Sequence, residues 1–152
     1  MTNTQEGMSL FEIVLSIGVL TLVLAGIVSL ATTSVRNSTF SKEKTLSSKY
    51  AQEASEWLRS ERDIDRTAFI NRAGAVDVAV NYCLQTLVWS NTGVCSAGEV
   101  ITGTPFKRDL TLTKKITSTK TVIEADVVVS WTDSQGEHQA RSSTYLSDWR
   151  ER

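Results

Sequence analysis

The longest pattern in the chain is an apolar run near its start. Residues 13–35 carry no charged side chain, and most of them are Ile, Val, Leu, Ala or Gly. As a helix with a rise of 1.5 Å per residue, this run extends about 35 Å, whereas the hydrocarbon core of a bilayer is roughly 30 Å thick. The pattern therefore predicts a helix that can span a membrane, with residues 13–31 as its apolar part.

The pattern after this run is that of an amphipathic helix. Residues 32–63 contain no Pro and no Gly, so nothing in them interrupts a helix. Apolar side chains recur at helical spacing and form one stripe, which predicts a single helix from about residue 9 to residue 62 with one face to bury. The stripe consists of Leu46, Tyr50, Ala54, Trp57 and Leu58. A short second helix is predicted over residues 67–73, capped by Asp65 or Thr67 and ended near Gly74.

The second half of the chain shows the pattern of β-strands. Residues 81–89, 106–114, 121–132 and 137–146 each read as a strand, with turns at residues 91–93 and 133–136. Residues 121–132 alternate most clearly, and one face holds Ile123, Ala125, Val127, Val129 and Trp131. An antiparallel meander of these strands would cover the helix stripe. We therefore predict an α+β fold in which a long N-terminal helix packs against a small antiparallel sheet.

A short motif precedes the apolar run. Gly7 is followed by the apolar Met8, and Glu12 is the fifth residue after the glycine. A carboxylate at the edge of a membrane helix calls for a partner, because an unpaired charge in hydrocarbon costs roughly 3 kcal/mol at the bilayer centre. Gly7, Met8 and Glu12, followed by about twenty apolar residues, resemble the N-terminus of type IV prepilins. The chain is thus similar to the type IV pilin-like family, which includes minor pilins and type II secretion pseudopilins.

The resemblance implies how such a chain is processed and assembled. A prepilin peptidase would cut between Gly7 and Met8 and methylate the new N-terminus of Met8. Glu12 would then pair with the N-terminal amine of a neighbouring subunit and set the register of assembly. The expected parts are a leader (residues 1–7), a helix for the membrane and the filament core (8–35), and a head with the type IV pilin fold (36–152). The implied partners are the peptidase, other pilin or pseudopilin subunits, and the assembly platform and motor.

The expected location also follows from the resemblance. Before assembly the chain would cross the cytoplasmic membrane once, with its N-terminus in the cytoplasm and its head outside, and afterwards it would belong to a surface filament. The stretch 51–73 and the C-terminal tail resemble small minor pilins, and the short cysteine loop favours a minor over a major subunit. Pilus, secretion and DNA-uptake systems all remain open.

Two simpler interpretations of the apolar run compete with this one. A secretory signal peptide usually has an apolar core of only about 7–15 residues, shorter than this run. A permanent single-pass anchor that never polymerises is the stronger competitor. Residues 1–7 contain no Lys or Arg, while Arg36, Lys42 and Lys44 follow the run. The positive-inside rule would then place the C-terminal part in the cytoplasm.

Two cysteines, Cys83 and Cys95, lie twelve residues apart. The one histidine, His138, is distant in sequence, so a structural zinc site is not indicated. A disulfide between them would add about 3 kcal/mol in the chain-entropy model and would indicate an oxidising compartment. Two reduced, buried thiols are the alternative.

The remaining chemistry argues against an enzyme. The chain has 16 basic and 17 acidic residues, so its net charge does not indicate a nucleic-acid partner. Glu124 and Asp126 are expected on the solvated face of a strand, and His138 on an exposed strand without a triad. We expect no cofactor and no metal site. A local basic group could contact DNA phosphates, although a charged edge that prevents strand aggregation is the preferred explanation; it comprises Lys107, Arg108, Lys114, Lys115 and Lys120. Trp89, Trp131 and Trp149 could form a partner surface, but at least two are expected in the core.

Overall fold

The computed structural model describes residues 9–89, 91–117 and 120–147. The chain divides into two compact units, Met1–Lys42 and Glu43–Arg152. One helix, α1 (Leu10–Ile64, 55 residues), contributes to both of them. We call the second unit the head and describe each unit separately.

The first unit is helical and has no core of its own in its described part. Its apolar side chains are exposed all round the helix; Leu22 is 74% and Leu30 is 73% accessible. Several of its hydroxyl groups bond to carbonyls of the same helix: Thr21 Oγ1 donates to Gly18 O (2.8 Å) and Thr32 Oγ1 to Val28 O (2.9 Å). Because these polar groups are satisfied within the helix, the segment can enter an apolar medium without losing hydrogen bonds. The helix is long and apolar enough to cross a membrane.

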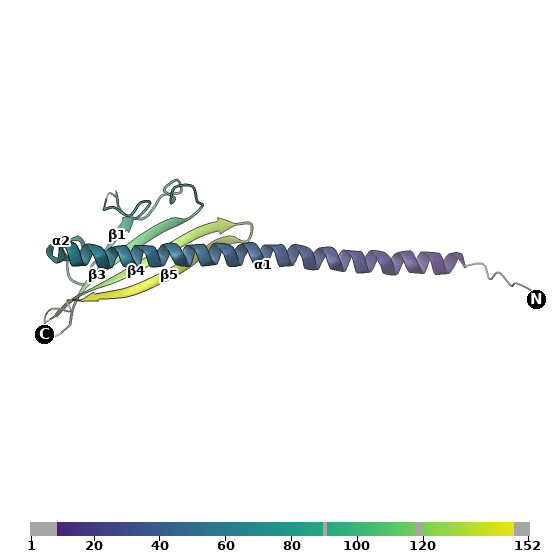
Figure 1. The fold of residues 1–152 in the computed structure, drawn as a ribbon, viewed down its shortest axis with the longest axis horizontal. Coiled ribbons are helices and arrows are strands. Elements are labelled where there is room, and N and C mark those ends of the chain that lie inside the picture. Colours follow the sequence, from purple (N-terminus) through teal and green to yellow (C-terminus); the bar gives the residue numbers. More distant parts are fainter. Residues whose placement is uncertain (1–8, 90, 118–119, 148–152) are drawn as a thin grey trace, which may run out of the picture. The chain divides into compact units, whose positions relative to one another are not determined.

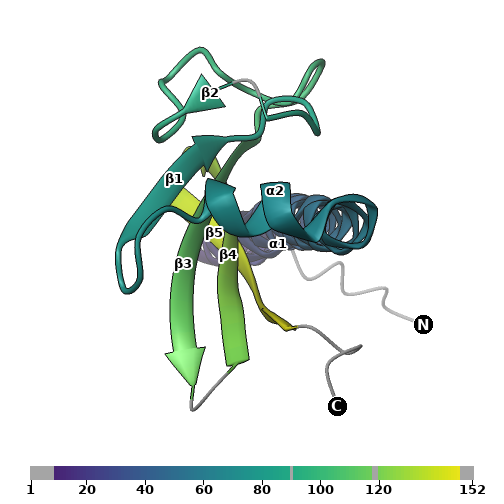
Figure 2. The same cartoon turned by 90° about the vertical axis from the view of Figure 1, so that its left-hand side faces the viewer.

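In the head, the distal part of α1 packs on a five-stranded sheet (Figures 1 and 2). The strand order is β2-β1-β3-β4-β5, and every neighbouring pair is antiparallel. The strands are β1 (Ala79–Cys83), β2 (Asn91–Thr92), β3 (Lys107–Thr117), β4 (Lys120–Asp133) and β5 (Gly136–Ser147). The α+β prediction of a long helix and an antiparallel sheet is confirmed at this level.

The short second helix is α2 (Arg66–Arg72), which follows α1 after one residue. Asp65 is its N-cap, and its carboxylate accepts a hydrogen bond from Ala68 N at 2.9 Å. Of the two predicted caps, Asp65 is therefore correct. Gly74 ends this region with φ +65°, and a Cβ built on it would lie 2.9 Å from Val80 Cγ2, so glycine is needed there.

The first predicted strand was too long. The structure ends β1 at Cys83, whereas we expected a strand over residues 81–89. Beyond this point Leu84 N still donates to Arg108 O (2.8 Å), but the chain then leaves the sheet, and Trp89 packs on the rings of Trp57 and Tyr82. Aromatic and β-branched residues favoured a strand here, and packing against the helix decided otherwise. Part of the predicted turn at 91–93 is the short strand β2, which pairs with the end of β1.

The helix face on the sheet is rotated from the predicted stripe toward small residues. The buried residues of α1 are Ser47, Ala51, Ala54, Ser55 and Leu58. Small side chains let the helix backbone approach the sheet closely, and the larger Tyr50 and Trp57 lie at the flanks and are only partly buried. The face predicted for residues 121–132 is confirmed, since all five of its inward residues are buried.

Candidate assembly segment and head surface

Glu12 lies in the first turn of α1, and its side chain is exposed. Backbone bonds start the helix here: Glu12 N donates to Ser9 O (2.9 Å), and Ser16 Oγ donates to Glu12 O (2.7 Å). Within the described residues, the Glu12 carboxylate makes no hydrogen bond or ion pair. The positive end of the helix dipole favours an anion at this position. Ser9 and Glu12 also have the spacing of a capping box, in which the glutamate side chain helps to start the helix. An experiment on Glu12 must therefore separate this local role from the role of its charge.

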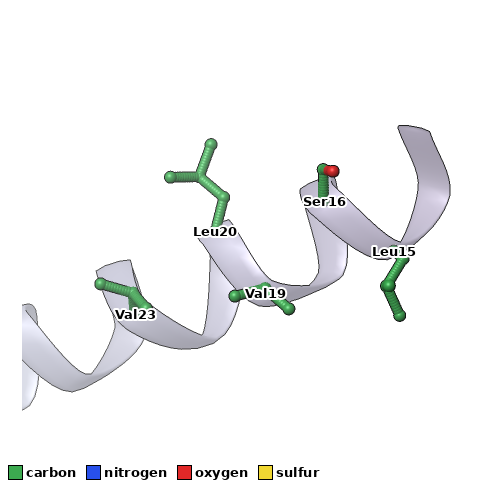
Figure 3. A pocket seen from close by; sticks show the side chains of 5 residues that line it. All are labelled: Leu15, Ser16, Val19, Leu20 and Val23. Carbon is green, nitrogen blue, oxygen red and sulfur yellow. The ribbon is translucent and has the colours of Figure 1, made fainter. Parts of the chain in front are cut away.

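The surface that follows Glu12 is apolar and belongs to a single helix. Leu15, Ser16, Val19, Leu20 and Val23 stand out from the α1 ribbon around a shallow depression (Figure 3). A second depression of the same kind lies beside Gly18, where no described atom other than those of its chain neighbours and the local helix backbone comes within 4 Å of the position of a Cβ. Such a surface fits lipid chains or other apolar helices. The expected cleavage residues, Gly7 and Met8, lie outside the described part of the chain.

The two cysteines are joined. Cys83 and Cys95 form a disulfide with a Cα–Cα distance of 4.7 Å, so the reduced-thiol alternative is not what the structure contains. The loop between β1 and β3, which contains Cys95, is fixed to β3, because Cys95 N donates to Asp109 Oδ1 at 2.6 Å. Burial raises the pKa of Asp109 above its usual value, and this N–H acts in the opposite direction. The disulfide thus attaches the loop between β1 and β3 to the sheet edge.

Arg108 does not belong to a basic surface, which corrects one member of the predicted phosphate-contacting group. Its side chain is only 3% exposed, because positions 108, 110 and 112 of β3 all face the helix. Arg108 Nε donates to Leu84 O (3.0 Å), and Nη1 donates to Tyr50 O (3.3 Å) and Glu53 Oε2 (3.0 Å). Burial lowers the pKa of Arg108, and Glu53 partly offsets this effect. Arg108 therefore ties the helix, the loop and the sheet together.

The four lysines of that group do not gather at one place either. Lys107 and Lys115 lie eight residues apart on β3, about 26 Å in an extended strand. Lys115 Nζ forms an ion pair with Glu124 Oε2 (2.5 Å). Lys114 is on the opposite face of the strand from Lys115, and Lys120 begins β4. Lys107 and the buried Arg108 are thus separate from the lysines near the β3–β4 hairpin, and the five residues do not form one patch.

The candidate catalytic groups are held in surface pairs. Bonding to Lys115 lowers the pKa of Glu124, and bonding to Arg141 lowers the pKa of Asp126. His138 Nε2 lies 3.0 Å from Asp133 Oδ1, and its ring packs at 5.4 Å on Trp131. Glu124 and Asp126 alternate with buried residues of β4, so both lie on the outer face of the sheet, as predicted. His138 is half-buried, whereas we expected it exposed. Within the described residues, no group of three His, Cys, Asp or Glu side chains could hold a metal ion.

The tryptophans contribute to the core. Trp131 is 1% exposed, as expected for a core residue. Trp89 is partly buried: its Nε1 donates to Glu61 Oε2 (2.6 Å), and the Arg72 guanidinium lies 4.6 Å from its ring centre. Trp149 lies outside the described residues. Trp89 and Trp131 therefore pack within the head and do not form a free aromatic surface.

Comparison of the chain with protein-family models, with curated proteins and with solved structures found no match.

Proposed function

We propose that this chain is a structural subunit, a minor pilin or pseudopilin, of a type IV pilus-like filament. The observation that carries the proposal is the contrast at the start of α1. Glu12 presents a carboxylate that has no partner among the described residues, and residues 13–35 after it form an uncharged helical segment whose apolar side chains are exposed on every side. A lone carboxylate at this place is unfavourable in a membrane, whereas a neighbouring subunit's amine would neutralise it in one register only.

The proposed course begins with cleavage between Gly7 and Met8 by a prepilin peptidase and methylation of Met8. The helix holds the subunit in the membrane until the platform and motor move it into a filament, where apolar helices bundle. Glu12 sets the register, and the head, with the type IV pilin fold, faces outward. The Cys83–Cys95 disulfide supports a head outside the cytoplasm, in opposition to the charge bias around the membrane helix.

The test separates the charge of Glu12 from its place in the helix. Glu12→Gln keeps the capping capacity of the side chain, since Gln serves in a capping box as Glu does, but it removes the charge. We expect Glu12→Gln and Glu12→Ala to insert into the membrane like the wild type and to lose incorporation into filaments. Incorporation of Glu12→Gln at the wild-type level would contradict the proposed role.

The second candidate is a permanent membrane-anchored binding domain, which the basic residues after the apolar run favour. Intact-mass measurement and N-terminal peptide mapping of the unreduced protein from its membrane distinguish the two. A chain that begins at N-methylated Met8 and is lighter by two hydrogens supports the filament subunit. A chain that begins at Met1 with free thiols supports an anchor whose C-terminal part faces the cytoplasm.

A further inference from the structure

Strand β5 forms one edge of the sheet: β4 lies on one side of it, and no strand of the described chain lies on the other. A two-residue turn joins β4 to β5, and Asp133 and Gly136 are the pair that flanks it. In such a hairpin the flanking pair is hydrogen-bonded, and bonded pairs alternate from there. The even-numbered residues of β5 therefore bond to β4. The backbone N–H and C=O groups of the odd-numbered residues point away from the sheet, at the open edge.

Two long basic side chains of α1 occupy this open edge, one near each end. Lys44 Nζ donates to Gln139 O (2.7 Å), and Arg62 Nη1 donates to Ser147 O (3.4 Å). Both acceptors are odd-numbered, in agreement with the alternation from the hairpin. Lys44 Nζ also lies 6.0 Å from the ring centre of Trp131, which helps to hold it at this place.

The helix and the strand match in length between these two contacts. Lys44 and Arg62 are eighteen residues apart on α1, about 27 Å along a helix. Their two acceptors are eight residues apart on β5, also about 27 Å along a strand. Between them, Ser55 Oγ lies 2.9 Å from Ser142 Oγ. Within the head, α1 and β5 thus run side by side in the same direction (Figure 1).

Between the two occupied carbonyls the edge is open. The outward N–H and C=O groups of Arg141, Ser143 and Tyr145 have no hydrogen bond to any described residue. Residues 142–147 carry no charge and contain neither Pro nor Gly. An uncharged edge strand of this kind is a template on which another strand can pair.

A second copy of the chain offers a matching edge. If two β5 strands paired antiparallel about Ser143, Arg141 of one copy would lie opposite Tyr145 of the other, and three residue pairs could bond. The next pair on each side would join Gln139 of one copy to Ser147 of the other. Their carbonyls are the two that α1 already occupies. Lys44 of one copy would also approach Arg62 of the other at both ends, so like charges would meet.

We propose that Lys44 and Arg62 guard the edge of β5. They occupy its two end carbonyls and place a positive charge at each end, and they thereby keep two heads from joining into one continuous sheet. The role concerns contacts of the head alone, so it does not depend on the proposed function.

Removal of both guards tests the proposal. Lys44→Met combined with Arg62→Met deletes the donors and the charges but keeps apolar stems of similar length. We expect the detergent-solubilised full chain to be monomeric as the wild type, and the double variant to dimerise with at least a tenfold higher association constant in sedimentation velocity. A double variant that is folded and as monomeric as the wild type would overturn the proposal.

The matched control removes two positive charges from α1 away from this edge. Lys49→Met combined with Arg59→Met changes the net charge equally, and Arg59 pairs with the exposed Glu56 and not with β5. We expect this control to remain monomeric. Dimerisation of the control to the same extent would assign the effect to net charge and contradict a guard role.

A cysteine locates the contact in the guard-free variant. With Ser143→Cys added, equal positions of the two copies would have Cα atoms about 5.5 Å apart in a hydrogen-bonded pair, within the reach of a disulfide. Mild oxidation should then give a reducible dimer and no larger species, and far less of it when the guards are present. Dimerisation without this bond would show that the copies meet elsewhere, and the proposal would be wrong.

A proline at the same position tests the direction of the backbone groups. Because Ser143 N–H points outward, Ser143→Pro removes a donor that the fold does not use, and an edge strand tolerates it. It should abolish dimerisation of the guard-free variant, and tryptophan fluorescence during denaturation checks that the head is folded. If loss of Arg62 unfolds the head, Lys44→Met alone opens one end of the edge, and we expect it to raise association several-fold. Association that Ser143→Pro leaves unchanged would contradict pairing through this edge.

Discussion

The same helix has two different environments along its length. In the first unit, leucines such as Leu24 remain about half exposed or more, whereas Leu58 in the head is completely buried. The head has its own sheet, its own core and a disulfide. Uncharged helical surface in the first unit has no cover among the described residues. An apolar surface of this extent in a stable protein needs an external partner, while the head meets its own packing needs.

The difference shows that a sequence can form one continuous helix whether or not its side chains are buried. The apolar half resembles a membrane helix, in which apolar side chains lie all round the axis and no face is distinguished. The head half carries a narrow buried line of Ser, Ala and Leu against strands β3 to β5. One continuous hydrogen-bonded helix can therefore serve a lipid phase with one half and a packed core with the other.

The largest effect is expected from shortening a leucine in the buried half. Leu58→Ala should lower the free energy of unfolding of the head by about 2–5 kcal/mol, because it removes apolar contacts and leaves a cavity. Leu24→Ala, the same change in the exposed half, should leave head stability unchanged. All four tryptophans of the chain follow residue 56, so tryptophan fluorescence during denaturation of the detergent-solubilised full chain reports on the head. Equal destabilisation by the two variants would contradict the division into two environments.

An introduced charge should affect the apolar half of α1 and leave the head unaffected. Val23→Arg places a cation near the middle of the apolar run and should disfavour membrane insertion by about 3 kcal/mol, with head stability unchanged. Val94→Arg is the matched control, because Val94 is also an exposed valine and belongs to the head. Alkaline extraction of membranes measures the retained fraction of each variant. If Val23→Arg were retained like Val94→Arg, the apolar run would not lie in the hydrocarbon.

The sequence predicted those parts of the fold that depend on a long, regular pattern. The apolar run, the helix that continues from it and the inward face of β4 all follow from patterns over many residues, whereas the local capping signal left two candidates, Asp65 and Thr67. The boundaries of β1 were wrong because Trp89 packs on the helix, which no local pattern reveals. The predicted helix stripe packs on the core, with Ala54 and Leu58 fully inside it, but the small buried residues beside the stripe, Ser47, Ala51 and Ser55, were missed because apolar size was given more weight than small volume.

The functional surface was less predictable than the fold. Arg108 was assigned to a basic surface from its charge and its neighbours in sequence. Its position two residues before Leu110 would have placed it on the inward face, so the strand period was the better guide. The role of Glu12, by contrast, depends on groups outside a single chain, which is why neither its sequence nor its geometry alone tests it.

The smallest effect is expected on the outer face of the sheet and concerns pH. The carboxylate of Asp126 accepts hydrogen bonds from Arg141 and Ser143, and bonding to Arg141 is the main reason why its pKa is lowered. The folded chain therefore protonates Asp126 at a lower pH than the unfolded chain does. This contribution to stability is complete above the usual aspartate pKa of about 4 and is lost as the pH falls through the lower folded value. Asp109, with a raised pKa, acts in the opposite sense.

Arg141→Gln should therefore reduce head stability at neutral pH and flatten its decline below about pH 4. The effect will be modest, since the Arg141 side chain is 62% exposed and solvent weakens such pairs. Lys49→Gln is the matched control, because it also removes one positive charge, but from a side chain without a described partner. Denaturation of the full chain at a series of pH values compares the three proteins. If Lys49→Gln flattened the acid decline as much as Arg141→Gln does, net charge and not the Arg141–Asp126 pair would be its cause. The outer face would then contribute to solubility alone, and the stability of the head would rest entirely on the side of the sheet that faces the helix.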